Sequence, residues 1–231
     1  MQKLGANHEN LDHKIYKEMK SMIFGRQLKP GTKIYQEKLA ETLGVSRTPV
    51  VSALKKLEQE RLITAVPRRG FYVRDFGKEE MVHIFELREV LEGLAARRAS
   101  ERVNENHLKK LQSFFQGLKI SAQKSDIEKY GEEDRRFHNF LIEIGGGELL
   151  SGILETYSIV TFSYLVGFPG GLVRPPKETL PEHLAIIEAI VQRDPEKAEQ
   201  AARLHLKRSR EKIARGLAEA KGAGKKERIP R

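Results

Sequence analysis

Four residues in the second half of the chain are of types that bind metal ions, and their spacing directs them toward one interior. Asp134 and His138 stand four positions apart, so both lie on one face of a predicted helix, and that face is the apolar one. His183 begins an apolar stripe on a later helix, and His205 falls on the small-residue stripe of the last helix. One carboxylate and three imidazoles that point inward from three helices form a donor set suited to a divalent metal ion.

A blander interpretation of the same residues stays open. A single histidine on an apolar face is more often a hydrogen-bonded core residue than a ligand, and Asp134 with His138 could be a buried pair. An unpaired carboxylate in a core is expensive, so Asp134 must have some partner in either case. The residues alone do not decide between a metal site and a set of satisfied core side chains.

The stretch from residue 31 to residue 73 has the pattern of a small DNA-binding unit. A short helix is predicted over Gln36–Leu43, and Gly44 supplies the tight turn after it. A second helix opens at Ser46, a good N-cap, with Pro49 in its first turn, where the missing N–H costs nothing. Two helices joined in this way predict a helix-turn-helix.

The first turn of the second helix and the strands after it carry the residues expected to touch DNA. Arg47 and Thr48 occupy the end that a recognition helix inserts into a major groove. Two β-type runs follow, over residues 62–66 and 70–74, and predict a wing. The basic tip between these runs contains Arg68, Arg69 and Gly70. A helical hairpin that only packs is the alternative, but the turn, the cap and the basic tip all lie where DNA docking needs them.

Length, composition and charge agree with a two-part protein. At 231 residues the chain is long enough for two domains, and the absence of cysteine excludes disulfides and thiolate metal sites. No 18-residue apolar run or signal-peptide pattern is present, so we expect a cytoplasmic location and no membrane partner. The net charge of +10 divides as +7 in residues 1–76, −4 in residues 77–206 and +7 in residues 207–231. A basic head on a mildly acidic body is typical of a DNA reader with a separate regulatory domain.

The body has helical periodicity throughout, so the expected fold class is mainly α: an N-terminal winged helix-turn-helix and a C-terminal all-α helical bundle. The expected domains are residues 1–76, residues 77–221 and a basic, disordered tail over residues 222–231. Three helices are expected to begin at caps: at the N-cap Asn104, at a capping box of Thr179 with Glu182, and at the N-cap Asp194 before Pro195. The glycines at residues 145–147 are expected to end one helix, and an apolar helix is expected over residues 149–168.

The order of these motifs resembles a known family over about residues 11–218. The N-terminal motifs LAETLGVSRTPV and PRRGFYV resemble the winged helix of the GntR family of bacterial transcription regulators. The body motifs ELREVLEGLAARRAS, DRRFHNFL, EHLAIIEAI and ARLHL resemble the helical ligand-binding domain of that family's FadR branch, the FCD type, in its metal-binding form. The resemblance therefore implies a ligand-responsive regulator that binds double-stranded operator DNA.

The resemblance also implies a role for the four inward-facing residues. In that branch an aspartate and three histidines bind a divalent metal ion inside the bundle, and the ion is zinc, nickel, manganese or iron, with zinc favoured here. The corresponding residues of this chain are Asp134, His138, His183 and His205. Four protein ligands on an ion that prefers five or six leave positions open for water or for a carboxylate.

The effectors of the resembled branch are typically small organic acids, so a small carboxylate effector coordinated by the metal is expected. Arg88, a cation in an otherwise apolar stripe, is the expected partner of its negative charge. An interhelical salt bridge, or one with Glu92, is the alternative role for Arg88. The segment over residues 156–168 carries no Arg or Lys where many members have basic residues, which favours an effector with an apolar part.

The recognition helix departs from the family at one position. The family usually reads SRTPVREAL, and this chain reads SRTPVVSAL, so Val51 stands where an arginine commonly contacts a guanine. A bidentate Arg–guanine pair provides about 1–3 kcal/mol of discrimination, so the usual operator is in doubt. The remaining contacts are expected from Arg47 on a base, from Thr48 on phosphate, and from the basic wing tip in the minor groove.

A single winged helix makes a modest footprint, so specific binding normally needs a dimer on two half-sites. The resembled branch dimerises through its helical domain, so we expect a homodimeric regulator and not an enzyme. Effector binding would change operator affinity by about 1–3 kcal/mol. Two alternatives are a metal-dependent hydrolase with a DNA-binding head and a non-specific DNA-binding protein that uses the two basic ends.

Overall fold

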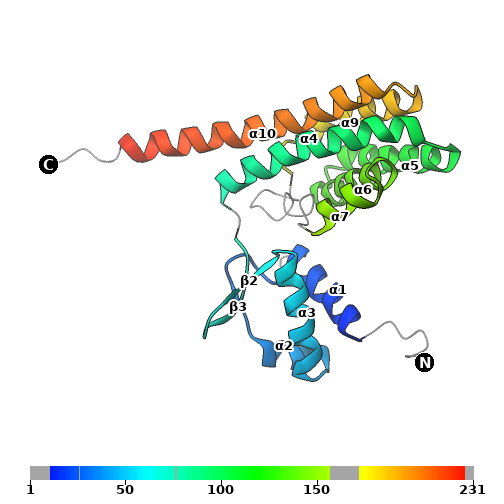
Figure 1. Ribbon diagram of the computed structural model, residues 1–231. Coiled ribbons are helices and arrows are strands. Elements are labelled where there is room, and N and C mark those ends of the chain that lie inside the picture. The colour runs from blue at the N-terminus through cyan, green and yellow to red at the C-terminus, as the bar shows by residue number, and fades with distance from the viewer. Residues whose placement is uncertain (1–10, 26, 76, 157–171, 227–231) are drawn as a thin grey trace, which may run out of the picture. The chain divides into compact units, whose positions relative to one another are not determined.

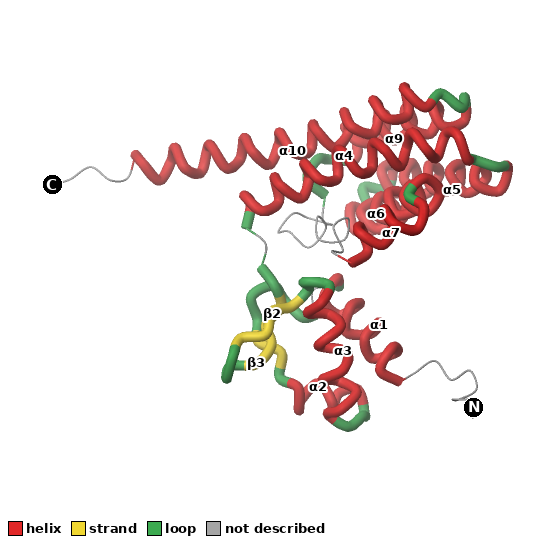
Figure 2. The backbone as a smooth tube through the Cα atoms, viewed as in Figure 1, coloured by secondary structure: helices red, strands yellow, loops and turns green. Residues whose placement is uncertain are grey.

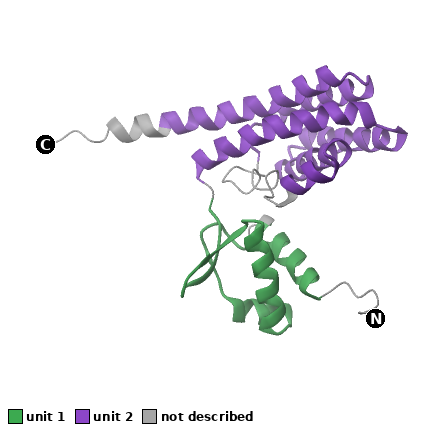
Figure 3. Cartoon of the chain, in the orientation of Figure 1, with its two compact units in different colours: residues 1–75, 156–158 green, residues 76–155, 159–231 purple. Residues whose placement is uncertain are grey.

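The computed structural model of the chain describes residues 11–25, 27–75, 77–156 and 172–226 (Figure 1). The chain forms two compact units, the first built mainly from residues before position 76 and the second mainly from residues after it (Figure 3). No helix in the described ranges has a segment long and apolar enough to cross a membrane.

The first unit contains the predicted helix-turn-helix. Its described elements are α1 (Leu11–Phe24), β1 (Lys33–Ile34), α2 (Gln36–Leu43), α3 (Arg47–Gln59), β2 (Ile63–Val66) and β3 (Gly70–Val73). Gly44 closes the turn between α2 and α3 with a φ of +64°, a left-handed conformation that glycine adopts without strain. Ser46 is the N-cap residue of α3, as predicted, and its hydroxyl makes no capping hydrogen bond.

The three strands form one antiparallel sheet in the order β1-β3-β2 (Figure 2). The strands β2 and β3 are the predicted wing, and Val66 pairs with Gly70 next to the basic tip. The strand β1 was not predicted, because it has only two residues and pairs with the distant Phe71 and Tyr72. The central strand β3 is therefore hydrogen-bonded along both edges.

The core of the first unit lies between α1, α3 and the sheet. The predicted inward face of α3 is confirmed by the burial of Val50, Ala53, Leu54 and Leu57. The helix α1 packs against α3. Its contribution to the core consists of Ile15, Tyr16, Met19 and Ile23. These residues repeat at helical spacing, so α1 buries one apolar face and holds the recognition helix in place.

The second unit is a bundle of helices without strands in its described residues, as the expected fold class requires. Its elements are α4 (Lys78–Arg102), α5 (Glu105–Gln123), α6 (Ile127–Gly145), α7 (Gly147–Thr156), α9 (Pro176–Val191) and α10 (Pro195–Lys226). The long helices α4 and α10 pack side by side, α6 packs on α4 and α5, and α9 packs on α10 and α5 (Figure 1).

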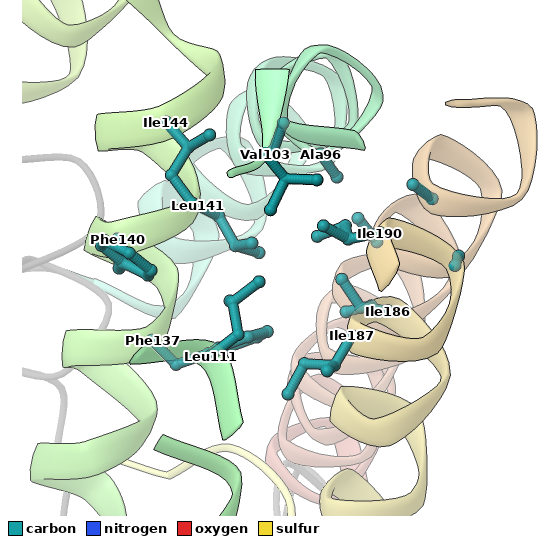
Figure 4. Close-up of a cluster of buried hydrophobic side chains, with 14 of the residues drawn as sticks. Ala96, Val103, Leu111, Phe137, Phe140, Leu141, Ile144, Ile186, Ile187 and Ile190 are labelled. Atoms are coloured by element: carbon teal, nitrogen blue, oxygen red, sulfur yellow. The ribbon is translucent and has the colours of Figure 1, made fainter. Parts of the chain in front are cut away.

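A cluster of buried apolar side chains joins these helices (Figure 4). Residues at its centre include Ala96, Leu111, Phe137, Leu141, Ile186 and Ile190. The ring centroid of Phe137 lies 5.1 Å from that of His183, so the apolar core continues into the polar site described below. Packing of this kind fixes the rotation of each helix, and thereby decides which polar side chains meet.

Two of the three helix caps predicted for the helical unit are confirmed. The side chain of Asn104 accepts a hydrogen bond from the backbone N–H of His107 at 2.9 Å, and Asp194 accepts one from Lys197 at 3.0 Å. The capping box of Thr179 with Glu182 was wrong. The helix α9 begins at Pro176, so Thr179 is already inside the helix, where its buried hydroxyl is used elsewhere.

The predicted boundaries at the glycine run and at the tail differ in detail from the structure. The helix α6 ends at Gly145 and α7 begins at Gly147, whose φ is +63°. The apolar helix expected over residues 149–168 is described only as far as Thr156, and the rest lies outside the described residues. The disordered tail was expected to begin at residue 222, whereas α10 is described as far as Lys226, and residues 227–231 lie outside the described residues.

The contact between α6 and α4 leads to a prediction. A Cβ atom added at Gly145 would lie 1.8 Å from the carbonyl oxygen of Ala95 in α4. The Gly145→Ala variant is therefore expected to lose about 3 kcal/mol of unfolding free energy, since backbone atoms would have to move apart. The matched control is Gly152→Ala in α7, where an added Cβ meets no atom within 4 Å. Urea unfolding measures both, and equal stabilities would contradict this packing.

Candidate metal centre and DNA-reading elements

The structure brings the four predicted ligands together inside the helical unit. Asp134 and His138 project from α6, His183 from α9 and His205 from α10, and each is 6% exposed or less. Carboxylate oxygens of Asp134 lie 3.0 Å from Nε2 of His183 and 3.9 Å from Nε2 of His138. One ring nitrogen of each histidine lies within 4.8 Å of those of the other two. Small side-chain movements would let one ion contact all of them.

Two of the histidines are held by carboxylates behind them. Nδ1 of His138 lies 2.6 Å from Oε2 of Glu92, and Nδ1 of His205 lies 2.8 Å from Oε2 of Glu182. An ionised carboxylate only accepts hydrogen bonds, so in both rings Nδ1–H donates to the carboxylate, and Nε2 is the nitrogen left for a metal ion. This is the arrangement that orients an imidazole toward a metal ion.

His183 is the most enclosed of the three histidines and has no exposed surface. Its Nδ1 lies 3.4 Å from the hydroxyl oxygen of Tyr130, which lies 2.8 Å from Oγ1 of Thr179. Its Nε2 lies 3.0 Å from a carboxylate oxygen of Asp134. An ion bound between Asp134 and the three imidazoles would replace this contact by coordination bonds.

Charges in the site keep its buried carboxylates ionised. Burial alone would raise the pKa of Asp134, but the facing imidazoles of His183 and His138 lower it well below its usual value. Burial would also raise the pKa of Glu92, but Arg88 and then His138 lower it to about 2. Both groups are therefore anionic near neutral pH, as a metal ligand and its supporting carboxylate must be.

The imidazole of His205, in contrast to these ionised carboxylates, is kept uncharged. Burial lowers its pKa to about 3, together with coulombic repulsion from His183 and against the hydrogen bond that His205 donates to Glu182. Burial raises the pKa of Glu182, but hydrogen bonds from Arg174, His205 and Arg208 lower it well below its usual value. A neutral imidazole backed by a carboxylate can offer a lone pair to a metal ion without first losing a proton to solvent.

Because His205 is uncharged in the folded protein, the unfolding free energy of the metal-free protein is expected to decrease at acidic pH. Its folded pKa of about 3 lies below the ordinary value of 6.5, so the unfolded chain binds the extra proton between these limits. Stability contributed by this group is complete above pH ~6.5 and falls toward lower pH, with a slope of up to about 1.4 kcal/mol per pH unit. Urea unfolding of chelator-treated protein on either side of pH ~6 measures this slope. A His205→Gln variant should have a shallower slope, and an equal slope would contradict the assignment.

A cavity of about 30 Å³, which is room for one or two waters, is lined by three of the four residues, Asp134, His138 and His205. Arg88 lies in its wall, as the sequence predicted for an effector contact, and its side chain is buried. The alternative role is also present, because Nε of Arg88 lies 2.5 Å from Oε1 of Glu92. The guanidinium therefore both supports the carboxylate behind His138 and faces the cavity.

Arg174 is a second buried cation at this cavity, and the sequence analysis did not single it out. Its guanidinium pairs with both carboxylate oxygens of Glu182 and donates to the carbonyl oxygen of His205 at 3.0 Å and to Oγ of Ser209 at 3.1 Å. It precedes α9 in a stretch rich in glycine and proline, where no helical period marks an inward position. Only the fold reveals that it supports the group behind His205.

In the first unit, the predicted DNA-contacting residues of α3 are exposed. Arg47 and Thr48 lie in its first turn, and Nη1 of Arg47 is 2.9 Å from Oε1 of Glu37. Both partners of this pair are more than half exposed, so the pair contributes little and can exchange for a base or phosphate. Val51 lies one turn later and is half-buried.

The wing tip presents a second set of basic residues. Arg68 and Arg69 are exposed, and Arg68 has a φ of +62°. Gly70 has a φ of +96°, which favours glycine at this position. A Cβ added there would lie 3.6 Å from the side chain of Lys33, so β1 brings a further cation to the tip. The sequence analysis missed Lys33 because it missed β1.

Comparison with known proteins assigns both units. Residues 11–73 match the family described as bacterial regulatory proteins, gntR family, and residues 83–208 match the FCD domain. The HTH-type transcriptional repressor RspR of Escherichia coli is 27% identical over 88% of this chain and 89% of its own length. The HTH-type regulator YdhC of Bacillus subtilis is 26% identical over 90% and 92%, and McbR of Escherichia coli is 31% identical over 64% and 67%.

Solved structures show the same fold. Escherichia coli McbR/YncC superposes with a TM-score of 0.75 at 22% identity and covers 91% of this chain and 100% of its own. A putative GntR regulator from Rhodococcus sp. RHA1 superposes with a TM-score of 0.74 at 18% identity, with coverage of 88% and 97%. The FCD match spans more than half of the chain and follows the gntR match along it. The chain therefore belongs to the GntR family of bacterial DNA-binding transcriptional regulators and carries an FCD domain.

Proposed function

We propose that this regulator senses a small organic acid at a divalent metal ion held by Asp134, His138, His183 and His205. The observation that carries the proposal is the convergence of the four donor groups: Nε2 of His183 lies 3.0 Å from a carboxylate oxygen of Asp134, and one ring nitrogen of each histidine lies within 4.8 Å of those of the other two. The carboxylates behind His138 and His205 add support, because each leaves Nε2 of its imidazole for a metal ion.

The donor set of three imidazoles and one carboxylate suits zinc, and also nickel, manganese or iron. Once bound, the ion would supply positive charge and open coordination positions that a carboxylate can occupy. The side chains of the protein hold the ligands, exclude water and fix the charge around the cavity.

Arg88 is the side chain that we assign to the carboxylate of the effector. It lines the cavity, is buried, and keeps its guanidinium in place through Glu92. A guanidinium oriented in this way can donate to an incoming carboxylate while it still donates to Glu92. In the absence of an effector, the same ion pair serves the structural role that is the alternative for Arg88.

The helix α4 offers a path from this site to the DNA-binding unit along one continuous element. It carries Arg88 and Glu92, and it begins at Lys78, a few residues after the wing strand β3 ends at Val73. Salt bridges from Arg210 of α10 to Glu86 and Glu89 tie the first half of α4 to the rest of the bundle. A shift of α4 on effector binding would therefore act on the segment that joins the wing strand β3 to α4.

We propose that two copies of the chain bind an operator with two half-sites and that the effector changes operator affinity about 5- to 150-fold. The relatives are regulators, and we assign no catalytic role to the metal centre. Because operator DNA in bacteria is cytoplasmic, the protein would act in the cytoplasm. A binding selection against random duplex DNA at physiological salt tests the DNA-binding half of the proposal. Enrichment of one two-part palindrome supports it, and weak, salt-sensitive binding without enrichment contradicts it.

The half-buried Val51 predicts a changed operator code at one base pair. The Val51→Arg variant is expected to gain a preference for guanine opposite that position, with about 1–3 kcal/mol of discrimination per half-site. Repetition of the selection with this variant measures the change. The Ser52→Arg variant, which adds the same charge at the next position, is the control and should raise general affinity without the new preference. Identical enriched sequences for wild type and Val51→Arg would contradict the docking of α3 in the major groove.

A further inference from the structure

The charged groups around the cavity are almost all buried, so their sum restricts the charge that a ligand can carry. The carboxylates are those of Asp134 and Glu92, which are buried, and of Glu182, whose side chain is 12% exposed; the guanidinium groups of Arg88 and Arg174 are buried. Imidazoles that bind a metal ion are neutral. The protein therefore contributes one negative charge in excess to this set.

Two charged residues touch the set at its outer edge, and they cancel. Arg208 donates to Glu182 at 2.7 Å, and Glu178 lies 4.0 Å from Arg174. Their side chains are 50% and 49% exposed, so water screens both charges. Residues 157–171, which precede this part of the chain, include no Asp, Glu, Lys, Arg or His and add no charge to the sum.

A divalent ion changes the sum from −1 to +1. We infer that the site selects small effectors with a single negative charge, monocarboxylates, over di- and tricarboxylates. The inference rests on the proposed function, because it takes the ion and a carboxylate effector as given. One carboxylate brings the buried set to neutrality, whereas a second would leave an uncompensated charge where solvation is poor.

The pairing of the two guanidinium groups points the same way. Arg88 is already paired with Glu92 at 2.5 Å, and Arg174 with both oxygens of Glu182. A second carboxylate on the effector would have to compete with these carboxylates for its donors.

Matched acids that differ in charge but not in shape test the inference. Succinamate and succinate form one pair, and malonamate and malonate form another, since an amide replaces one carboxylate in each. Calorimetric titration of the zinc-loaded protein is expected to show that the singly charged acid of each pair binds at least roughly tenfold more tightly than the doubly charged acid. The zinc content is measured after each titration, so that chelation of the ion by malonate is recognised.

Variants that remove one negative charge provide the second arm. Glu182→Gln takes the ion-loaded set from +1 to +2 and is expected to shift the preference toward succinate by roughly tenfold. Glu178→Gln removes the same charge from the exposed edge, where screening is strong, and should leave the preference unchanged. If Glu182→Gln loses zinc because His205 is no longer held, the wild-type comparison decides alone.

The outcomes separate the two levels of the proposal. Equal or tighter binding of succinate and malonate by the wild-type protein overturns the charge inference while leaving the proposed function intact. An equal shift of preference in Glu182→Gln and Glu178→Gln overturns it as well. If no acid of either pair, nor acetate, binds the zinc-loaded protein, the proposed function itself fails.

Discussion

Replacement of Asp134 by alanine is expected to abolish stoichiometric metal binding by the FCD domain. The carboxylate faces Nε2 of His183 at 3.0 Å and Nε2 of His138 at 3.9 Å, so it is the anionic member of the donor set. Loss of a supporting residue behind a ligand weakens metal binding about 10- to 100-fold, and loss of a direct ligand should exceed the upper value. Elemental analysis after dialysis against a weak chelator measures the content.

The matched control uses a second carboxylate of the same helix. Asp126 caps α6 by accepting a hydrogen bond from the backbone N–H of Lys129 at 3.0 Å, and its side chain is exposed. Asparagine keeps this cap, so Asp126→Asn should retain the ion. An ion retained in full by Asp134→Ala would contradict the metal centre. The metal centre would also be contradicted if the wild-type protein contained no stoichiometric ion and the His183→Ala substitution left the unfolding free energy unchanged.

The Arg47→Ala variant is expected to lose sequence-specific operator binding. One base contact contributes about 1–3 kcal/mol, and a dimer loses it at both half-sites, which corresponds to a weakening of roughly 30-fold to more than 1,000-fold. The cost to folding should be small, because the ion pair with Glu37 is more than half exposed on both sides. Competition binding to the selected operator and to a scrambled duplex measures the specific and general parts separately.

A lysine outside the reading elements serves as the control for Arg47→Ala. Lys14 is exposed on α1 and carries the same charge. The Lys14→Ala variant should lower the affinities for operator and scrambled duplex by a similar small factor, because it removes only general attraction to phosphate. An Arg47→Ala variant that behaves like Lys14→Ala, with its operator preference intact, would show that another residue reads the bases.

The features of this protein that could be predicted from its sequence are those set by local periodicity. Helical spacing placed Asp134, His138, His183 and His205 on apolar faces, and the structure buries all four in one site. Helices that pack with their apolar faces inward bring polar residues on those faces near one another. The turn at Gly44 likewise defines α2 and α3, because its left-handed conformation suits glycine.

The groups that support the ligands could not be predicted in this way. Glu92 meets His138 across 46 positions of sequence, and Glu182 meets His205 across 23. Arg174 completes this arrangement from a stretch without helical period. Contacts of this kind depend on how two helices rotate against each other, which the apolar pattern restricts but does not specify.

Local signals also misled where a competing signal was stronger. The pattern of Thr179 and Glu182 fits a capping box, but Pro176 suits the first helical position and starts α9 earlier. Thr179 then lies inside the helix and hydrogen-bonds Tyr130, while Glu182 turns to His205. The strand β1 was missed for a different reason, since two residues carry too little alternation to indicate a strand.

The most direct test of the account is the operator affinity of the zinc-loaded protein as acetate and lactate are titrated, with Asp134→Ala measured in parallel. The operator is the duplex enriched by the wild-type protein. If the metal centre senses the effector, at least one acid changes the operator affinity of the wild-type protein about 5- to 150-fold and leaves the operator affinity of Asp134→Ala unchanged. An equal response of the two proteins, or no response of the zinc-loaded wild type to either acid, would contradict it.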